Sequence, residues 1–254
     1  MILGNKILIS SQYDSDAMAF IIATNISNIT QCNAISTLVG SLKAAGIWQK
    51  MKAIYPFIGG TAASHKFNLK DPRDLDIAYR ILFSGGIQHS ENGVLPNGST
   101  GFGDTRLNTS VLSATNNSLA YYSKSNTTGN TVDIGVYDGS RFFTVGLSNY
   151  PYNYLCGAVD NVINFNTVTK GLFLQSRLSS FNFAGYKNAT LIGSNSSVGN
   201  GFPLGNALLF KRADGFYGNK ECAFASIGEG LTATEVTLYY NIIQTYQQSL
   251  NRQV

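Results

Sequence analysis

The stretch GLFLQSRLSSFNFAGY, residues 171–186, has the pattern of two short β-strands joined by a tight turn. Apolar residues occupy every second position, as Leu172 and Leu174 in the first half and as Phe181 and Phe183 in the second. This period of two is typical of strands with one buried face. The stretch therefore predicts a β-hairpin.

The same kind of short segment recurs along most of the chain, at residues 78–83, 119–123, 131–137, 142–147, 207–210 and 222–227. Dipeptides that favour the positive φ of tight hairpin turns lie among them, namely Asn92-Gly93, Asn97-Gly98, Asp138-Gly139, Asn200-Gly201 and Asp214-Gly215. Eight or more strands at this spacing predict a mainly β protein, an antiparallel β-sandwich.

The clearest helix signal lies near the C-terminus. Leu231, Thr232, Glu235 and Val236 have the spacing of a capping box with its hydrophobic staple. Apolar and aromatic residues then follow at helical spacing, namely Val236, Tyr239, Tyr240, Ile243, Tyr246 and Leu250. We expect an amphipathic helix over residues 233–249 that packs this stripe on the sandwich, with a groove on a partner as the alternative.

A second helical region is predicted near residues 30–53. Ile35, Leu38, Val39 and Leu42 follow three- and four-residue steps, with Thr30 as the expected N-cap and Gly46 as the end. A short helical piece over residues 47–53 would turn Trp48 and Met51 inward. Residues 1–16 are predicted to form an extended arm that joins a sheet or docks on a partner, and residues 17–254 to form one domain.

The composition excludes several classes of protein. Of 254 residues 44% are hydrophobic and 13% charged, and the 18 basic residues are scattered, so no clustered basic face for nucleic acid is expected. No apolar run is long enough to cross a membrane, and no signal peptide is evident, so folding in a reducing cytoplasm is expected. The eight Asn-x-Ser/Thr triplets are then surface composition rather than glycosylation sites. Cys32, Cys156 and Cys222 are predicted to be buried thiols, and no cofactor or metal is assigned.

Four stretches carry a resemblance to a known family: AIYPFIGGTAASHKFNLKDP at residues 53–72, GFGDT at 101–105, YYS at 121–123 and CAFASIGEGLT at 222–232. In their order they resemble the concanavalin A-like (laminin-G-like) jelly-roll module of virion fibre and appendage proteins from Bacteroidetes-infecting tailed phages, including crAss-like phages. The resemblance spans residues 17–254.

It implies a jelly roll in a bacteriophage virion protein, a head (capsid) fibre, tail fibre or decoration subunit made in the host bacterial cytoplasm. Arm residues 1–16 would anchor the subunit to capsid or tail proteins, and a homotrimer is expected.

Catalysis is not expected. Folds of this kind also host glycoside hydrolases, whose chemistry needs two carboxylates facing across the sugar. The four glutamates, Glu91, Glu221, Glu229 and Glu235, do not show the alternating Glu-x-Asp-x-Glu pattern of such enzymes. A capsule depolymerase is therefore the weakest hypothesis. Asp133 and Asp138 are expected to stabilise a turn or to be exposed. Calcium candidates are Asp104, Asp133, Asp138 and Asp160, but no loop has dense oxygen ligands, and no site is assigned.

His65 begins an alternating segment, residues 65–70, in which Phe67 and Leu69 would face inward and Lys66, Asn68 and Lys70 outward. With His89 as the second histidine of the chain, we interpret His65 as a structural residue rather than a general base.

The candidate binding residues are Tyr150, Tyr152, Asn153 and Tyr154, in an expected loop. Tyrosine rings stack on sugar faces and amides hydrogen-bond hydroxyl groups. These residues support the alternative function of an adhesin for host capsule or mucin glycans. The competing interpretation is that the rings pack on the sheet or against a neighbouring subunit.

Overall fold

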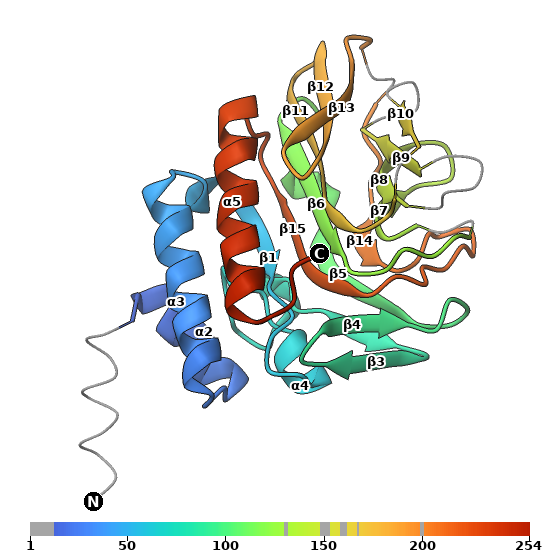
Figure 1. Cartoon of the computed structure of the whole chain (residues 1–254). Coiled ribbons are helices and arrows are strands. Elements are labelled where there is room, and N and C mark those ends of the chain that lie inside the picture. Colours follow the sequence, from blue (N-terminus) through green and yellow to red (C-terminus); the bar gives the residue numbers. More distant parts are fainter. Residues whose placement is uncertain (1–12, 130–131, 148–152, 158–161, 167, 199–200) are drawn as a thin grey trace, which may run out of the picture.

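The structure is a computed structural model. It describes residues 13–129, 132–147, 153–157, 162–166, 168–198 and 201–254. Two antiparallel sheets pack face to face, and a layer of helices covers the outer face of one of them (Figure 1). The expected antiparallel β-sandwich with an N-terminal and a C-terminal helix is confirmed.

The larger sheet has eight strands in the described part of the chain. In spatial order they are β13 (Thr190–Asn195), β12 (Asn182–Lys187), β11 (Gly171–Ser179), β6 (Asn117–Ser123), β15 (Cys222–Gly228), β4 (Gly93–Pro96) and β3 (Ile87–Ser90), with β1 (Met51–Tyr55) paired to β15. β11 and β12 form the hairpin predicted from residues 171–186, in the register Leu174 opposite Tyr186.

The smaller sheet has seven described strands. In order they are β10 (Val162–Phe165), β9 (Asn153–Cys156), β8 (Phe142–Gly146), β7 (Ile134–Tyr137), β14 (Asn206–Leu209), β5 (Phe102–Asn108) and β2 (Leu82–Ser84). Asp138-Gly139 lies in the turn that joins β7 to β8, as its turn chemistry predicts. The turn between β3 and β4 is Glu91-Asn92 instead of the predicted Asn92-Gly93, because Gly93 already pairs with Ser90 as the first residue of β4.

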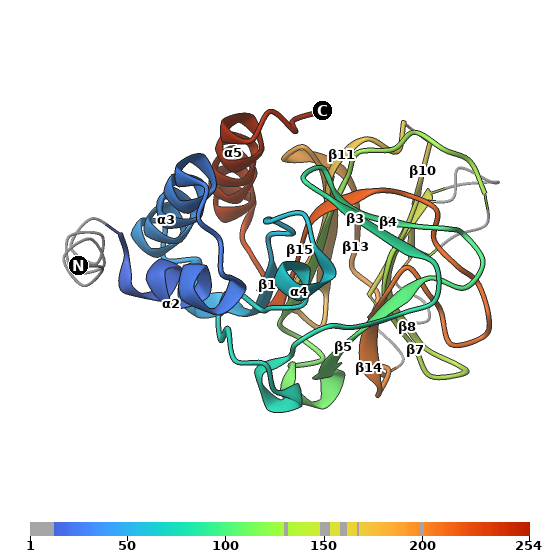
Figure 2. The same ribbon diagram turned by 90° about the horizontal axis from the view of Figure 1, so that it is seen from below.

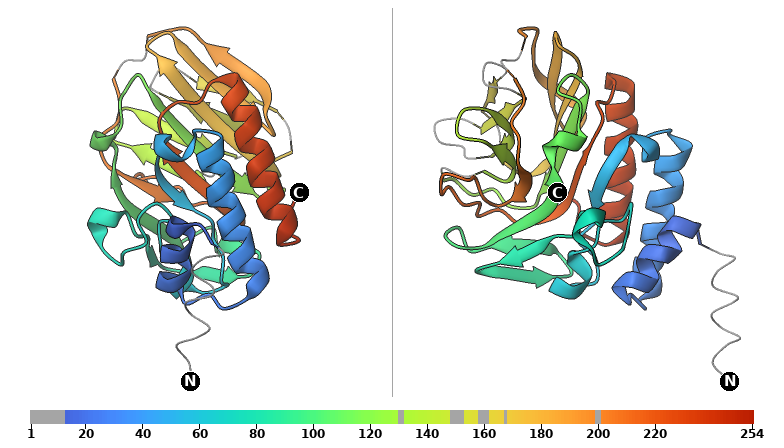
Figure 3. Two further views of the ribbon diagram at one scale, coloured as in Figure 1. Left: turned by 90° about the vertical axis from the view of Figure 1, so that its left-hand side faces the viewer. Right: turned by 180° about the vertical axis from the view of Figure 1, so that it is seen from behind.

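The helix layer consists of α2 (Ser15–Thr24), α3 (Ile29–Ala44) and α5 (Ala233–Ser249). Seen from below, it lies on one side of the larger sheet, and seen from the helix side α3 and α5 run across that sheet together (Figures 2 and 3). Shorter helical pieces lie in the connections, namely α4 (Ala62–His65), η1 (Trp48–Lys50), η2 (Asp76–Ala78) and η3 (Thr109–Val111).

There are two hydrophobic cores, one on each side of the larger sheet. Leu172 and Leu174 face the helices, whereas Phe173 packs between the two sheets. The central strands β6 and β11 are thus buried on both faces. The prediction that β11 has only one buried face is therefore wrong. The prediction also fails at Phe181, which is 64% exposed because it lies in the turn before β12.

Helix α5 has the predicted bounds and the predicted cap. The amide of Glu235 donates to the Thr232 hydroxyl at 3.3 Å, and the amide of Thr232 donates to the Glu235 carboxylate at 2.9 Å. Val236 and Tyr246 are buried against the larger sheet and the other helices, as their spacing predicts. The apolar stripe of α5 therefore packs in the core.

The N-terminal region differs from its prediction in three places. The N-cap of α3 is Asn28 rather than Thr30, because the Asn28 side chain accepts the amide of Gln31 at 3.2 Å. Trp48 and Met51 do point inward, but residues 51–53 belong to strand β1 rather than a helix, since they pair with β15. α2 was not predicted, and it begins at Ser15, inside the residues expected to be an extended arm. Residues 1–12 of that arm lie outside the described residues.

Candidate functional site

Half of the predicted glycan-binding set lies outside the described residues, namely Tyr150 and Tyr152. Asn153 and Tyr154 form the start of β9, between β8 and β10, so their backbone lies in the smaller sheet rather than in a loop. Their side chains are outside what the structure describes, as is Asp160. Of the predicted binding set, the backbone of Asn153 and Tyr154 thus has a position in the fold, on an inner strand of the smaller sheet.

The outer face of that sheet is the open face of the sandwich, because the helices cover the opposite side of the molecule (Figure 2). Alternate residues of its strands point away from the core between the sheets. On β5 these are Phe102, Asp104 and Arg106, and on β14 they are Asn206 and Leu208. These side chains are partly exposed. A ligand approaching the sandwich from this side would meet them first.

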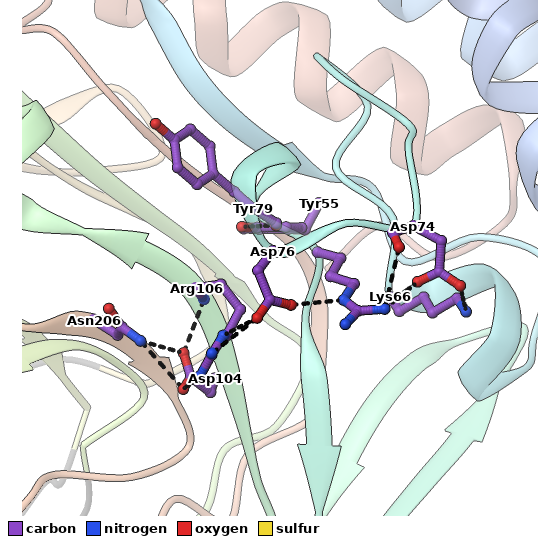
Figure 4. Close-up of polar contacts among 9 residues, drawn as sticks. Tyr55, Lys66, Asp74, Asp76, Tyr79, Asp104, Arg106 and Asn206 are labelled. Carbon is purple, nitrogen blue, oxygen red and sulfur yellow. Dashed lines mark hydrogen bonds and ion pairs between the residues drawn. The ribbon is translucent and has the colours of Figure 1, made fainter.

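A chain of ion pairs crosses one end of this face (Figure 4). We call it the ionic chain, and its successive contacts are Lys66–Asp74 at 2.5 Å, Asp74–Arg80 at 3.0 Å, Arg80–Asp76 at 2.8 Å, Asp76–Arg106 at 2.8 Å and Arg106–Asp104 at 3.1 Å. At its end, Asn206 donates to the Asp104 carboxylate at 3.1 Å. Three bases and three acids alternate, so their charges balance.

A β-bulge places the central part of the ionic chain. The register between β14 and β5 shifts between Asn206 and Leu208, and Arg106 takes the left-handed φ of 57°. The Asp104 carboxylate accepts the backbone amide of Arg106 at 2.8 Å, which holds this conformation. Asp104 and Arg106 are alternate residues of β5 and so share the outer face, and this hydrogen bond fixes the backbone between them.

Two carboxylates of the ionic chain, Asp74 and Asp76, are held in the ionised form. Hydrogen bonds from Lys66 and Arg80 lower the pKa of Asp74, and hydrogen bonds from Arg80 and Arg106 lower the pKa of Asp76. A glycosidase needs instead a carboxylic acid that stays protonated near neutral pH. Because Asp76 is 44% exposed, water screens its ion pairs, and the ionic chain orients side chains more than it stabilises the fold.

Part of the ionic chain has a signal in the sequence, which is a local run of charged residues. Residues 70–80, KDPRDLDIAYR, hold six charged residues in a protein with 13% charge. Arg106 and Asp104 lie far from them in sequence, so only the pairing of β5 with β2 and β14 brings the two groups together.

The two histidines meet beside the larger sheet. His65 is buried, and its Nδ1 lies 3.0 Å from Nδ1 of His89, so one ring donates a hydrogen and the other accepts it. Burial, with the nearby His89 and Arg252, lowers the pKa of His65 to about 3. Both rings are therefore neutral near pH 7, which agrees with a structural role for His65.

The segment after His65 follows its predicted alternation only in part. Phe67 and Leu69 are buried as expected. Asn68 is buried too, contrary to the prediction, because its side chain accepts the amide of Ile54 at 2.9 Å and donates to the carbonyl of Ala78 at 3.1 Å. Asn68 thus connects strand β1 to the η2 turn through these two hydrogen bonds.

Asp133 is neither exposed nor a turn residue, so that expectation is wrong. It is fully buried, and one carboxylate oxygen accepts the amide of Leu147 at 2.7 Å. Burial raises its pKa, while the charge of the buried Lys220 acts in the opposite direction. Asp138 does stabilise the turn, since it accepts the amides of Ser140 and Arg141. Because Asp133 has no exposed surface, a ligand in solution cannot contact it.

The described residues also bear on metal binding, membrane crossing and cysteine chemistry. They contain no group of three or more side chains suited to hold a metal ion. No helix among them has both the length and the apolar character needed to cross a membrane. Cys32 and Cys222 are buried free thiols, as expected, and the side chain of Cys156 is outside the described set.

No protein-family model matches the chain, and no curated protein matches it. Solved structures do match. Domain 4 of AbnA, a GH43 extracellular arabinanase from Geobacillus stearothermophilus in complex with arabinotriose, is 16% identical with a TM-score of 0.50, and the match covers 77% of this chain and 98% of that one. Botulinum neurotoxin type C, which interacts with two ganglioside molecules, is 15% identical with a TM-score of 0.51, over 79% of this chain and 53% of that one. This chain thus spans about half of the toxin chain. At these identities the likeness establishes the β-sandwich fold.

Proposed function

We propose that this chain is a non-enzymatic subunit on the surface of a bacteriophage particle, a head or tail fibre or decoration protein. The proposal rests on where the sequence stretches that resemble the phage module lie in the fold. Residues 53–55, 121–123 and 222–228 form or end the adjacent strands β1, β6 and β15 at the centre of the larger sheet. Three of the four stretches that resemble the phage module thus meet in the larger sheet, and the fourth, residues 101–105, lies on β5 of the smaller sheet.

These stretches are buried scaffold. Tyr55, Tyr121 and Ala225 are inaccessible to solvent and pack in the core between the sheets. Residues of this kind specify a fold rather than a reaction, so the resemblance concerns the architecture of a particle protein. The balanced, ionised charges of the ionic chain add no acid catalyst, which supports a non-enzymatic role.

The test is the position of the chain in a purified particle. Mass spectrometry of particles should find it at many copies, and a particle reconstruction should place its density on the outside of the capsid or tail. A chain found in infected cells but not in purified particles would contradict the proposal. For the arm, we propose attachment to other virion proteins. A variant lacking residues 1–12 should fold, with the circular dichroism of the full chain, but fail to enter particles.

We further propose a homotrimer. Apolar side chains are exposed close together in sequence, with Ile77 at 75%, Leu75 at 49% and Leu82 at 39%, and Leu82 lies on β2, an edge strand of the smaller sheet. Edge strands with exposed apolar residues favour association with another chain. Light scattering should give three times the monomer mass, and Ile77→Asp should lower it. A monomer at high concentration would contradict the proposal.

A second function, compatible with the first, is binding of host capsule or mucin glycans. It is favoured by the open face of the smaller sheet and by similar folds whose structures include arabinotriose or whose proteins interact with gangliosides. A glycan array should detect binding that Tyr152→Ala weakens if the predicted tyrosine segment contributes. Release of reducing ends from host capsule would instead indicate a depolymerase and contradict the non-enzymatic role.

A further inference from the structure

The open face of the smaller sheet contains a hollow of about 250 Å³ between β7 and β14. We call it the β7–β14 hollow. Its lining includes Gly135, Tyr137, Gly205, Asn206, Leu208 and Ala213. Pockets for drug-sized ligands usually measure roughly 300–1,000 Å³, so this one suits a smaller group such as a single sugar ring.

Two glycines make the floor of the hollow. Gly135 has a φ of 145°, and a Cβ there would lie 2.1 Å from the carbonyl oxygen of Phe143, so a side chain cannot be placed without moving the neighbouring strand. A Cβ on Gly205 would lie 3.2 Å from Val136. Gly135 is buried and Gly205 is partly exposed, and neither adds a side chain that would fill the hollow.

One wall of the hollow is an aromatic ring that is held in place. Tyr137 stacks on Phe142 with ring centroids 4.4 Å apart and planes 17° apart, and its hydroxyl donates to the carbonyl of Gly139 at 2.8 Å. The guanidinium of Arg212 lies 5.4 Å from the centroid of each ring. A ring fixed in this way loses little conformational entropy when a ligand stacks on it.

A second lining residue, Asn206, is a fixed polar group. The Asn206 amide donates to Asp104 at 3.1 Å, and Asp104 is itself held by the backbone amide and the guanidinium of Arg106. The carboxamide of Asn206 is thus oriented at the edge of the hollow, by the end of the ionic chain. A lining with an aromatic ring and an oriented amide has the groups that bind the apolar face and the hydroxyl groups of a sugar.

The charges around the hollow favour a neutral ligand. Arg106 pairs with Asp104 and Asp76, and Arg212 pairs with Asp214 at 2.6 Å. Both arginines are thus already neutralised by carboxylates, and an acidic sugar would have to compete with those carboxylates.

We propose that the β7–β14 hollow is a subsite for one neutral sugar ring, with Tyr137 against the apolar face of the sugar and Asn206 hydrogen-bonded to its hydroxyl groups. The proposal rests on the glycan-binding function proposed above and names the site and the ligand class. The ionic chain then acts as the support that orients Asn206 through Asp104.

The experiment uses the full chain on a glycan array of neutral and sialylated oligosaccharides, followed by titration of the best neutral probe. We expect Tyr137→Ala and Asn206→Ala each to weaken binding at least tenfold, and Tyr137→Phe, which keeps the ring, to stay within about threefold of the parent. The control is Gln248→Ala, an exposed amide on α5 in the helix layer, which should leave affinity unchanged. Circular dichroism confirms that each variant is folded.

Three results would overturn the subsite. Binding of a neutral probe that survives both Tyr137→Ala and Asn206→Ala, or is lost only with Tyr152→Ala, leaves glycan binding intact but places it elsewhere. Binding to sialylated probes alone refutes the ligand class. Binding to no glycan refutes both the subsite and the glycan-binding function, and leaves the particle role to be decided by the particle experiments.

Discussion

Arg252, near the C-terminus, is the residue whose loss should damage the fold most. Its side chain is 2% exposed, and it makes no ion pair with any residue that the structure describes. All five of its N–H donors are used instead, on the Gln247 side chain at 2.9 Å and on the backbone carbonyls of Phe57 at 2.7 Å, Pro56 at 3.1 Å, Ala223 at 3.1 Å and Glu91 at 3.2 Å. Arg252 thus joins α5, β15, the end of β1 and the β3–β4 turn.

The expected cost follows from the acceptors that Arg252→Ala leaves behind. The carbonyls of Pro56 and Ala223 each keep another donor, so the other three acceptors bear most of the loss. A buried acceptor without a partner costs about 1–3 kcal/mol, and water entering the space left by the side chain reduces the total. We expect Arg252→Ala to lower the free energy of unfolding by about 3–5 kcal/mol. For a chain of this size that corresponds to a fall in Tm of roughly 6–20 °C.

Urea unfolding followed by circular dichroism and fluorescence measures this change. Arg252→Lys, with three donors for five acceptors, should cost about half as much. The control is Arg73→Ala, which removes an arginine whose side chain is 60% exposed and paired with Asp71, and should cost less than about 1 kcal/mol. If Arg252→Ala unfolds within about 1 kcal/mol of the parent chain, the buried hydrogen-bond network does not hold these segments together.

Three further predictions concern stability. The pKa of His65 is lowered to about 3 in the folded chain, so below pH 6.5 the unfolded chain binds a proton on this ring that the folded chain does not. The free energy of unfolding should therefore fall by about 2–3 kcal/mol between pH 6.5 and 4.5. Urea titrations at each pH should show that His65→Gln removes this loss. Thr232→Ala should cost about 1 kcal/mol in urea unfolding by removing the cap of α5, whereas Thr237→Ala inside the same helix should stay within about 0.5 kcal/mol; equal effects would refute the capping role. Gly93→Ala should cost more than about 2 kcal/mol in thermal melts, since its Cβ would lie 2.2 Å from the carbonyl oxygen of Cys222, and an unchanged Tm would show that the two strands move apart freely.

The strands that the sequence pattern predicted are those with apolar residues or turn dipeptides at their ends. β6, β11, β12 and β15 all fall within a few residues of their predicted bounds. The pattern missed strands such as β13, whose side chains are mostly exposed. A polar edge strand forms because a neighbouring strand offers hydrogen bonds, and its own sequence carries little of that signal.

The candidate site was predicted less well than the fold. The tyrosine segment was found because its residue types are unusual, but its surroundings could not be derived from local sequence. The polar residues that face the open sheet, Asp104, Arg106 and Asn206, are ordinary residues in sequence. They become a group only through a β-bulge and the pairing of strands about one hundred residues apart.

Local sequence accounts for several features of this protein: the capped helix α5 at Thr232, the turn at Asp138-Gly139, and a composition low in charge. These depend on backbone preferences and hydrogen bonds within four residues, so a short window contains their cause. Tertiary structure alone decided that β11 is buried on both faces and that Asp133 and Arg252 lie inside. Burial of that kind depends on which distant segment covers a residue and supplies its hydrogen bonds, and only the assembled layers settle that.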